Sequence, residues 1–210
     1  MATVLCIQAS PMGTLSFSVR AAQAFLASYR EAHPADTVRT LDLATAAIPA
    51  FDFAAASGKY RIMHGQPHTP EEAKAWRAVE ETVRDFKAAD KYVLASPMWN
   101  FGIPYRLKQY VDVLVQPGLT FSYTPGEGYK GLVTGRPAVL ILARGGSYAE
   151  GNPAQTMDFQ RPYLEAVLRF IGFERIETIL VEPTLAGGPD GAARALAAAE
   201  TAARRMAKAF

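Results

Sequence analysis

The sequence predicts an α/β fold over residues 1–210, a single domain in which five parallel strands are doubly wound in the order 2-1-3-4-5. Short, continuously apolar runs alternate along the chain with longer segments of helical periodicity, as expected for parallel crossover connections. The apolar runs also lack the period-two alternation of a half-solvated sheet. Helices are therefore expected on both faces of the sheet.

The first third of the chain is expected to form strand, helix and strand in turn. Residues 3–8 are a β-branched apolar run, residues 16–29 carry apolar side chains at helical spacing, and residues 38–43 form the second strand. Residues 44–69 contain interspersed Pro and Gly and are expected to be irregular. That stretch is long for a passive connection.

A helix is expected from Pro70 to about Ala88. Thr69 precedes it as a cap, Pro70 occupies the first turn, and Glu72 stands where a capping box places its acid. The acidic pairs of this helix are interpreted as a solvated face rather than as acid and base catalysts. They are Glu71, Glu72, Glu80 and Glu81.

The rest of the chain continues the alternation of strands and helices. Residues 92–96 form the third strand, and Pro104 begins a helix. Between Gly118 and Gly135, strand-like alternation in "TFSYT" and several glycines indicate a hairpin or lid. The remaining elements are expected as strand 138–143, helix 162–171, strand 176–181 and helix 189–208.

The composition disfavours several classes of function. The 22 basic and 20 acidic residues give a formal net charge of +2 without runs of like charge, so no nucleic-acid partner is expected. No apolar stretch approaches the ~20 residues that span a bilayer, and no basic leader precedes the N-terminal run. A cytoplasmic protein without membrane contact is expected. Cys6 is expected to pack in the core, and the three histidines show no metal-ligand spacing, so no metal is expected.

The predicted strand order places the carboxyl ends of strands one, three and four side by side. Ligands of doubly wound sheets bind at such a point, where the winding direction reverses. The three loops at this point are residues 9–18, 97–103 and 144–151. We therefore expect these loops to form one binding site.

The first of these loops suits a terminal phosphate. It lacks the G-x-G-x-x-G pattern of a dinucleotide site, and it carries Ser10, Thr14, Ser16 and Ser18 just before a helix. Hydroxyls and unpaired N–H groups at a helix N-terminus bind anions. An ordinary helix cap at Ser16 explains the same residues equally well.

The second and third loops suit a flat ring. The run "PMWNFG" offers an apolar wall, and its Asn100 and Gly102 are poor core residues, which argues against simple packing. In "ARGG", Gly145 and Gly146 permit close approach of backbone N–H groups to a ligand, although a sharp turn would use them too. Together the loops describe a site for a phosphate-bearing heteroaromatic, and flavin mononucleotide (FMN) is its natural occupant.

Six segments carry a resemblance to a known family. They are "SFS" at 16–18, "PMWNF" at 97–101, "LKQYVD" at 107–112, "GLTFSYT" at 118–124, "GLVTGRPA" at 131–138 and "RGG" at 144–146. In this order they resemble the FMN-dependent NADH-azoreductases, the bacterial flavodoxin-like quinone reductases. The resemblance covers essentially the whole chain and implies one flavodoxin-like domain. It also implies a homodimer with one tightly bound FMN per subunit.

The resemblance further implies an enzyme that passes two electrons from NADH or NADPH to quinones, or to azo compounds that are cleaved to aromatic amines. Donor and acceptor would use one site in turn, a ping-pong exchange for which the protein needs no catalytic nucleophile and no metal. The implied cofactor contacts are Ser10, Ser16, Phe17, Ser18, Met98, Trp99, Asn100, Phe101, Ala143, Arg144, Gly145 and Gly146. Tyr123 and Tyr148 are implied on the substrate side.

Three residues depart from the family pattern. Trp99 replaces its usual Tyr, Ala143 replaces its usual Ser, and Tyr148 stands where many relatives have His. Tyr148 is expected to matter most, because it changes shape and hydrogen bonding beside the flavin. Two other functions stay open at this point. One is a flavodoxin-like electron carrier, which the positive net charge disfavours, and the other is an interaction protein of this fold without a cofactor.

Overall fold

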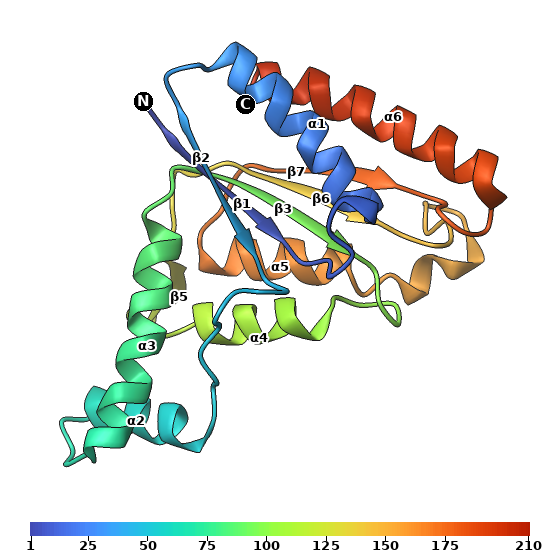
Figure 1. Cartoon of the computed structure of the whole chain (residues 1–210). Helices are drawn as coiled ribbons and strands as arrows, with labels where there is room; N and C mark the ends of the chain where they lie inside the picture. The colour runs from blue at the N-terminus through green and yellow to red at the C-terminus, as the bar shows by residue number, and fades with distance from the viewer.

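The computed structural model describes residues 1–210 and has a parallel sheet of five strands at its centre (Figure 1). The strand order is β2-β1-β3-β6-β7. The bounds are β1 (Thr3–Gln8), β2 (Thr37–Asp42), β3 (Lys91–Pro97), β6 (Ala138–Ala143) and β7 (Ile176–Val181). This arrangement confirms the predicted five-stranded parallel sheet of an α/β fold.

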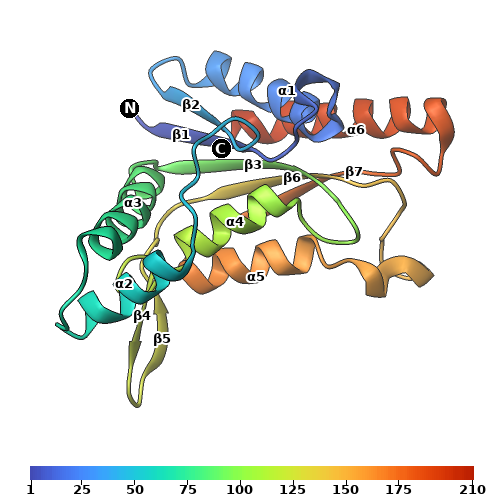
Figure 2. The same ribbon diagram turned by 60° about the horizontal axis from the view of Figure 1, so that its bottom comes forward.

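Helices cover both faces of the sheet, as Figure 2 shows. On one face lie α1 (Phe17–Ala32) and α6 (Gly188–Lys208), and on the other lie α3 (Pro70–Lys87), α4 (Tyr105–Leu114) and α5 (Arg161–Ile171). Successive residues of one strand enter opposite cores, because side chains alternate across a sheet. In β6, Val139 packs on the α1 and α6 side while Leu140 packs on the other side. The strand is therefore apolar throughout.

A further helix, α2 (Phe53–Met63), lies within the stretch that was expected to be irregular, and it breaks the strict alternation of strands and helices. Asp52 caps it by accepting the backbone N–H of Ala55 at 3.2 Å. The helix packs closely on α3, and a Cβ added at Gly58 would lie 2.6 Å from the Glu72 carbonyl oxygen. Tertiary packing thus stabilises a short helix whose interior glycine disfavours it locally.

The start of α3 carries the predicted capping box, but Glu72 is not part of a solvated face. Its carboxylate is buried and accepts hydrogen bonds from the Ser57 hydroxyl at 2.6 Å and the Thr69 N–H at 2.7 Å. These bonds, that from Ser57 foremost, hold the pKa of Glu72 below its ordinary value. The interpretation of this residue as a solvated acid was wrong, because α2 covers it.

The hairpin expected between Gly118 and Gly135 is present as β4 (Phe121–Thr124) and β5 (Gly128–Gly131), a separate two-stranded sheet. It supplies the fourth and fifth strands of the chain. The main sheet is therefore ordered 2-1-3-6-7 along the whole chain, which corrects the predicted numbering 2-1-3-4-5.

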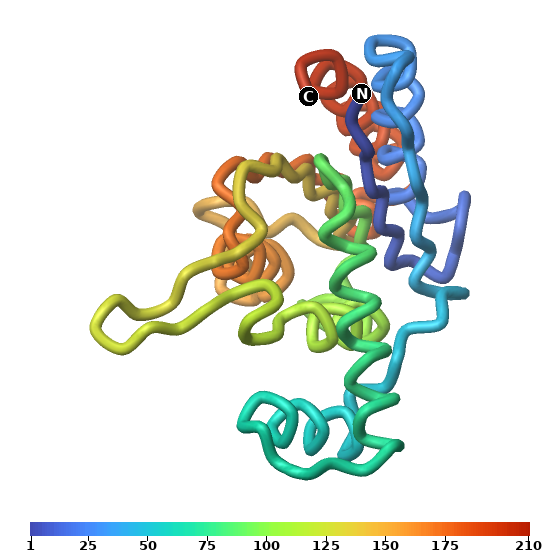
Figure 3. Tube along the Cα trace, turned by 90° about the vertical axis from the view of Figure 1, so that its left-hand side faces the viewer, coloured from blue at the N-terminus to red at the C-terminus, as the bar shows by residue number.

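The hairpin lies near the amino ends of the sheet strands and projects from the body of the molecule (Figure 3). Lys87, at the end of α3, donates its Nζ to the Leu119 carbonyl at 2.8 Å, and Val133 N–H donates to the Ile171 carbonyl at 2.8 Å. The ends of α3 and α5 directly precede β3 and β7, so these bonds hold the hairpin near the amino ends of those strands. No helix of the molecule has the length and apolarity needed to cross a membrane.

Candidate functional site

The three loops expected to form a site meet at the carboxyl edge of the sheet. Strand β3 lies between β1 and β6, and its residues Ala95 and Pro97 pair in register with Gln8 and Ala143. The pairing continues past the strands, because Met98 N–H donates to the Ala143 carbonyl at 2.8 Å. Ala143 is itself buried, so its missing hydroxyl leaves this backbone contact intact.

The first loop leaves the start of α1 without a side-chain cap. Ser16 is the N-cap residue, yet its hydroxyl makes no capping hydrogen bond and lies instead 3.1 Å from the hydroxyl of Ser18. The alternative of an ordinary cap at Ser16 is therefore wrong. Ser10, Ser16 and Ser18 are all buried, whereas Thr14 is exposed on the short helix η1 (Gly13–Leu15). Phe17 between the serines packs against the α1 and α6 core.

An uncapped helix start is suited to binding an anion. The first backbone N–H groups of any helix have no partner within the helix, and the aligned peptide dipoles give this end a partial positive charge of about half a unit. Here the two serine hydroxyls stand at the same point, and no acidic residue occupies the first turn of α1. A phosphate would find hydroxyls, N–H donors and a favourable potential together.

The second loop is a tight two-residue turn. Trp99 and Gly102 exchange backbone hydrogen bonds at 3.1 and 2.9 Å, and Asn100 and Phe101 between them have φ values of 48° and 68°. Two positive φ values in succession are typical of type I′ turns, which favour Asn at the first position. Asn100 is thus explained in part by its backbone, a reason that the sequence analysis missed.

The same turn exposes two large aromatic side chains. Trp99 is 39% exposed and Phe101 is 44% exposed, while Met98 before them is half-buried. Phe101 is held in a backbone conformation that costs a residue with a side chain of order 1 kcal/mol or more. Strain of this kind persists where the surrounding structure imposes it, and it is concentrated at functional sites.

The third loop offers backbone donors. The Arg144 carbonyl accepts the N–H of Thr184 at 2.9 Å, and the Gly145 carbonyl accepts the N–H of Leu185 at 3.0 Å. In contrast, the N–H groups of Gly145 and Gly146 donate to no acceptor within the protein. The three atoms nearest to a Cβ at Gly146 would all belong to Tyr148, the first at 3.7 Å, so no tight contact closes the open space beside this residue.

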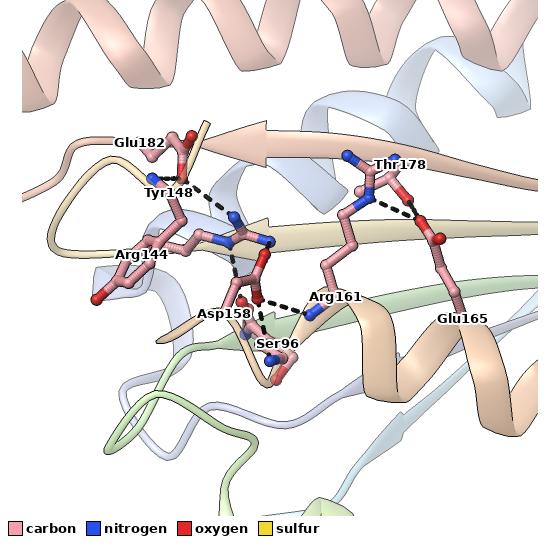
Figure 4. A network of polar contacts seen from close by, with 9 residues as sticks. Ser96, Arg144, Tyr148, Asp158, Arg161, Glu165, Thr178 and Glu182 are labelled. Atoms are coloured by element: carbon pink, nitrogen blue, oxygen red, sulfur yellow. Dashed lines mark hydrogen bonds and ion pairs between the residues drawn. The ribbon is translucent and has the colours of Figure 1, made fainter. Parts of the chain in front are cut away.

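The Arg144 side chain does not reach into this open space. It is 1% exposed and forms ion pairs with Asp158 and Glu182 (Figure 4). Its Nη2 lies 2.9 Å from Asp158 Oδ2, without the alignment of a hydrogen bond. The guanidinium is thus engaged within the protein. The backbone of Arg144 is engaged too, because its N–H donates to the Val181 carbonyl at 3.0 Å and its carbonyl accepts from Thr184, so the free donors of this loop begin at Gly145.

The two tyrosines expected on the substrate side lie far apart within one chain. Tyr148 is half-buried in the third loop, where its N–H donates to Glu182 Oε2 at 3.4 Å. Tyr123 is on β4 at the opposite end of the sheet, 58% exposed, with its ring centroid 5.0 Å from that of Tyr129. The structure does not bring Tyr123 to the site of its own chain.

Several residues beside the site were missed by the sequence analysis. A groove of about 650 Å³ adjoins the Trp99–Gly102 turn, and Phe51 and Tyr105 line it. Phe159, which is exposed, donates its N–H to the Phe101 carbonyl at 3.0 Å. Phe51 and Phe159 are far from the turn in the sequence, so no local pattern indicated them, whereas Tyr105 follows the turn within three residues.

The site contains no activated thiol and no metal cluster. Cys6 is buried in β1, and desolvation raises the pKa of its thiol to about 12, which keeps the thiol protonated and unreactive. No group of three or more His, Cys, Asp or Glu side chains is placed to hold a metal ion. What the edge of the sheet offers is an anion site, an exposed aromatic pair and free backbone donors.

Comparison with known proteins gives consistent similarities along the whole chain. The family profile for the flavodoxin-like fold matches residues 2–207. An FMN-dependent NADH:quinone oxidoreductase of Nitratidesulfovibrio vulgaris is 55% identical over 210 residues, with 100% of both chains covered. The crystal structure of an azoreductase from Bacillus anthracis strain Sterne is 37% identical, has a TM-score of 0.92 and matches over 100% of both chains.

A second Bacillus anthracis structure bears on the ligand. It is an FMN-dependent NADH-azoreductase in complex with FMN, 32% identical to this chain, with a TM-score of 0.87. The match covers 99% of this chain and 100% of that structure. A protein with a related sequence and the same fold is thus known in complex with FMN.

Proposed function

The chain belongs to the flavodoxin-like family of FMN-dependent NADH:quinone oxidoreductases and azoreductases, and on this premise we propose that it performs their reaction. It is an FMN-dependent oxidoreductase that takes electrons from NADH and reduces quinones and azo compounds. The observation that carries the proposal is the convergence of three features at one sheet edge. They are the uncapped start of α1, the exposed Trp99 and Phe101, and the free N–H groups of Gly145 and Gly146.

These residues fit the chemistry of FMN. Ser10, Ser16 and Ser18 with the start of α1 would hold the phosphate, because they combine hydroxyls and N–H donors. Trp99 and Phe101 would form the apolar wall for the ring system. Met98, Asn100 and the backbone from Ala143 to Gly146 would contact its polar edge. The chemistry that bound FMN supplies is hydride uptake from the nicotinamide and delivery of two electrons to the acceptor.

The Gly145 and Gly146 donors have a specific role in this proposal. Their N–H groups would act as fixed donors toward the edge of the ring system that carries negative charge in the reduced cofactor, and donors aimed at developing charge favour the charged state. These donors are free of protein acceptors, so binding costs no internal hydrogen bond. Tyr148, half-buried in the same loop, would shape the space in which donor and acceptor alternate.

We also propose that the active protein is a cytoplasmic homodimer in which residues 1–210 of each chain act as one unit. Tyr123 and Tyr129 are exposed on a projecting hairpin, far from the site of their own chain, which supports a contact with a second copy. In that arrangement Tyr123 of one chain would stand beside the flavin of the other. Acceptors would then bind between Tyr123 and Tyr148.

Purified protein is expected to be yellow, to release FMN on denaturation, and to oxidise NADH steadily when a quinone is supplied. Reduction of an azo dye under the same conditions tests the second acceptor class. A colourless protein with no affinity for FMN would instead indicate an interaction protein of this fold without a cofactor. A yellow protein that does not turn over NADH with any quinone would indicate an electron carrier.

Asn100→Gly is expected to lower FMN affinity or the rate of flavin reduction about tenfold, the effect of losing one hydrogen bond of ordinary strength. Glycine tolerates the φ of 48° at this position, so the turn is kept while the amide is lost. Fluorescence titration with FMN and stopped-flow reduction by NADH measure the two quantities. If both match the wild-type protein, the Asn100 side chain does not contact the flavin.

A further inference from the structure

A buried ionic cluster lies directly behind the third loop. Arg144 is 1% exposed, and the carboxylates of Asp158 and Glu182 are each 10% exposed. One positive and two negative charges give the cluster a formal net charge of −1. Removing such charges from water costs free energy, and apolar side chains of similar volume are commonly as stable. Stability alone therefore does not account for this cluster.

The three charged residues come from three separate segments. Arg144 follows β6, Glu182 follows β7, and Asp158 lies between the short helix η2 (Pro153–Met157) and α5. Glu182 Oε2 lies 3.3 Å from Arg144 Nη1 and also accepts the N–H of Tyr148 at 3.4 Å. Figure 4 shows both carboxylates beside the guanidinium, with the Tyr148 N–H directed at Glu182. The cluster thus joins the start and the middle of the third loop to the neighbouring segments.

The tripeptide Asp158-Phe159-Gln160 extends this connection to the second loop. Gln160 accepts from Arg144 Nε at 3.3 Å and donates its Nε2 to the Ser96 carbonyl of β3 at 3.3 Å. Between these two residues, Phe159 N–H donates to the Phe101 carbonyl at 3.0 Å. One short segment therefore contacts Arg144 on one side and the aromatic turn on the other.

We infer that Arg144 is a positioning residue for the flavin ring. Its guanidinium, held by Asp158 and Glu182, sets the separation between the N–H donors of Gly145 and Gly146 and the Trp99–Gly102 turn. The identity of the ring rests on the proposed function. The phosphate grip is independent of this cluster, since Ser16 and Ser18 stand at the start of α1 and contact none of its members.

The isosteric substitution Glu182→Gln separates positioning from charge. It removes one negative charge near the flavin, which by Coulomb interaction alone would favour the anionic reduced form and raise the reduction potential. Loss of positioning acts in the opposite direction, because misplaced donors stabilise the reduced form less. The sign of the change in potential therefore decides between the two effects.

We expect Glu182→Gln to lower the affinities for oxidised FMN and for riboflavin by the same factor. That factor is about tenfold, the effect of weakening one hydrogen bond. If the affinity for the reduced flavin falls tenfold more than that for the oxidised flavin, the two-electron midpoint potential of the bound flavin falls by about 30 mV. Equilibrium dialysis and spectroelectrochemical titration measure these quantities. A potential that rises or stays unchanged, or a loss confined to FMN, overturns the inference.

Arg161→Gln is the matched control. Arg161 pairs with Glu165 at 2.7 Å on the surface beside the cluster, and its side chain contacts none of the cluster's charged groups. The variant is expected to keep the wild-type affinities and potential. If Glu182→Gln does not fold, Arg144→Lys replaces it as the test variant, because it keeps the charge but loses the planar guanidinium. The same losses of flavin affinity and the same fall in potential are expected for it.

Amide hydrogen exchange in the flavin-free protein gives a readout without turnover. Phe159 N–H donates to the Phe101 carbonyl at 3.0 Å, shares its proton with the Met157 carbonyl at 3.1 Å, and does not bond to Glu182. Faster exchange at Phe159 therefore reports a weakened contact of this segment with the second loop. Glu182→Gln is expected to speed exchange at Phe159 at least tenfold while Arg161→Gln does not, and equal rates overturn the inference. A wild-type protein that binds neither flavin contradicts the proposed function, and the exchange result then decides the positioning role separately.

Discussion

Replacing Ser16 and Ser18 together by Ala is expected to lower the affinity for FMN about 100-fold and to leave the affinity for riboflavin unchanged. Hydrogen bonds to a charged group contribute about 1.5–3 kcal/mol each, so two of them account for about 3 kcal/mol or more. Riboflavin lacks the phosphate and cannot make these bonds. The difference between the two ligands thus isolates the phosphate contact.

The structure supports this expectation in two ways. Ser16 is the N-cap residue of α1 but its hydroxyl does not cap the helix, so the substitution removes no structural cap. Ser18 is fully buried, and its hydroxyl is close only to that of Ser16, at 3.1 Å. The fold is therefore expected to tolerate the loss of both hydroxyls.

Ser28→Ala is the matched control for the serine pair. Ser28 is also a buried serine of α1, near the other end of the helix, and the same atoms are removed. It is expected to bind FMN as the wild-type protein does. Isothermal titration with FMN and riboflavin provides the measurement. Equal losses for the two ligands in the double variant would show that the serines do not hold a phosphate.

Gly131→Ala is expected to lower the free energy of unfolding by about 3 kcal/mol, at the upper end of the cost of inserting a methyl group into a packed region. A Cβ at this position would lie 2.3 Å from the backbone nitrogen of Gly172 and 2.5 Å from the carbonyl carbon of Ile171. Both neighbours are backbone atoms, which cannot rotate away as a side chain can. The hairpin would have to move from α5.

Urea unfolding followed by circular dichroism measures this change. Gly191→Ala in α6 is the matched control, since a Cβ there would meet only Arg194 Nη2, at 4.0 Å. The free energy of unfolding of that variant is expected to be higher than that of the wild-type protein by about 0.5–1 kcal/mol, because alanine is the better helix former. Similar stabilities for the two variants would contradict the close crossing of β5 over the end of α5.

The hairpin variant also bears on the proposed dimer. Tyr129 contacts Phe170 of α5 with ring centroids 5.5 Å apart, so displacement of β5 moves the exposed tyrosines. If Tyr123 of a second copy stands beside the flavin, Gly131→Ala is expected to impair acceptor reduction as well as stability. If only the stability changes, the hairpin does not contribute to the site of a second copy.

Much of the fold could be predicted because its signals are local. The continuous apolar run of β6 indicates burial on both faces, and Thr69 with Glu72 forms the capping box that its spacing predicts. The hairpin followed from alternation and glycines over a few residues. In contrast, α2 was missed, because its weak pattern and Gly58 acquire their meaning only against α3.

The site shows the same division. Residue types and strand order were sufficient to indicate which three loops meet, because parallel strands end at a common edge. The sequence could not decide whether Ser16 caps α1, where the Arg144 side chain points, or where Tyr123 stands.

The sequence by itself determined the layered architecture, the edge of the sheet at which three loops meet and the chemical character of those loops. Only the tertiary structure decided which side chains face that edge and which are held within the protein. The physical reason is the range of the interactions involved. Periodicity and capping act over one or two turns, whereas Arg144 meets Glu182 across 38 positions and Gly131 meets Gly172 only when the hairpin docks on α5.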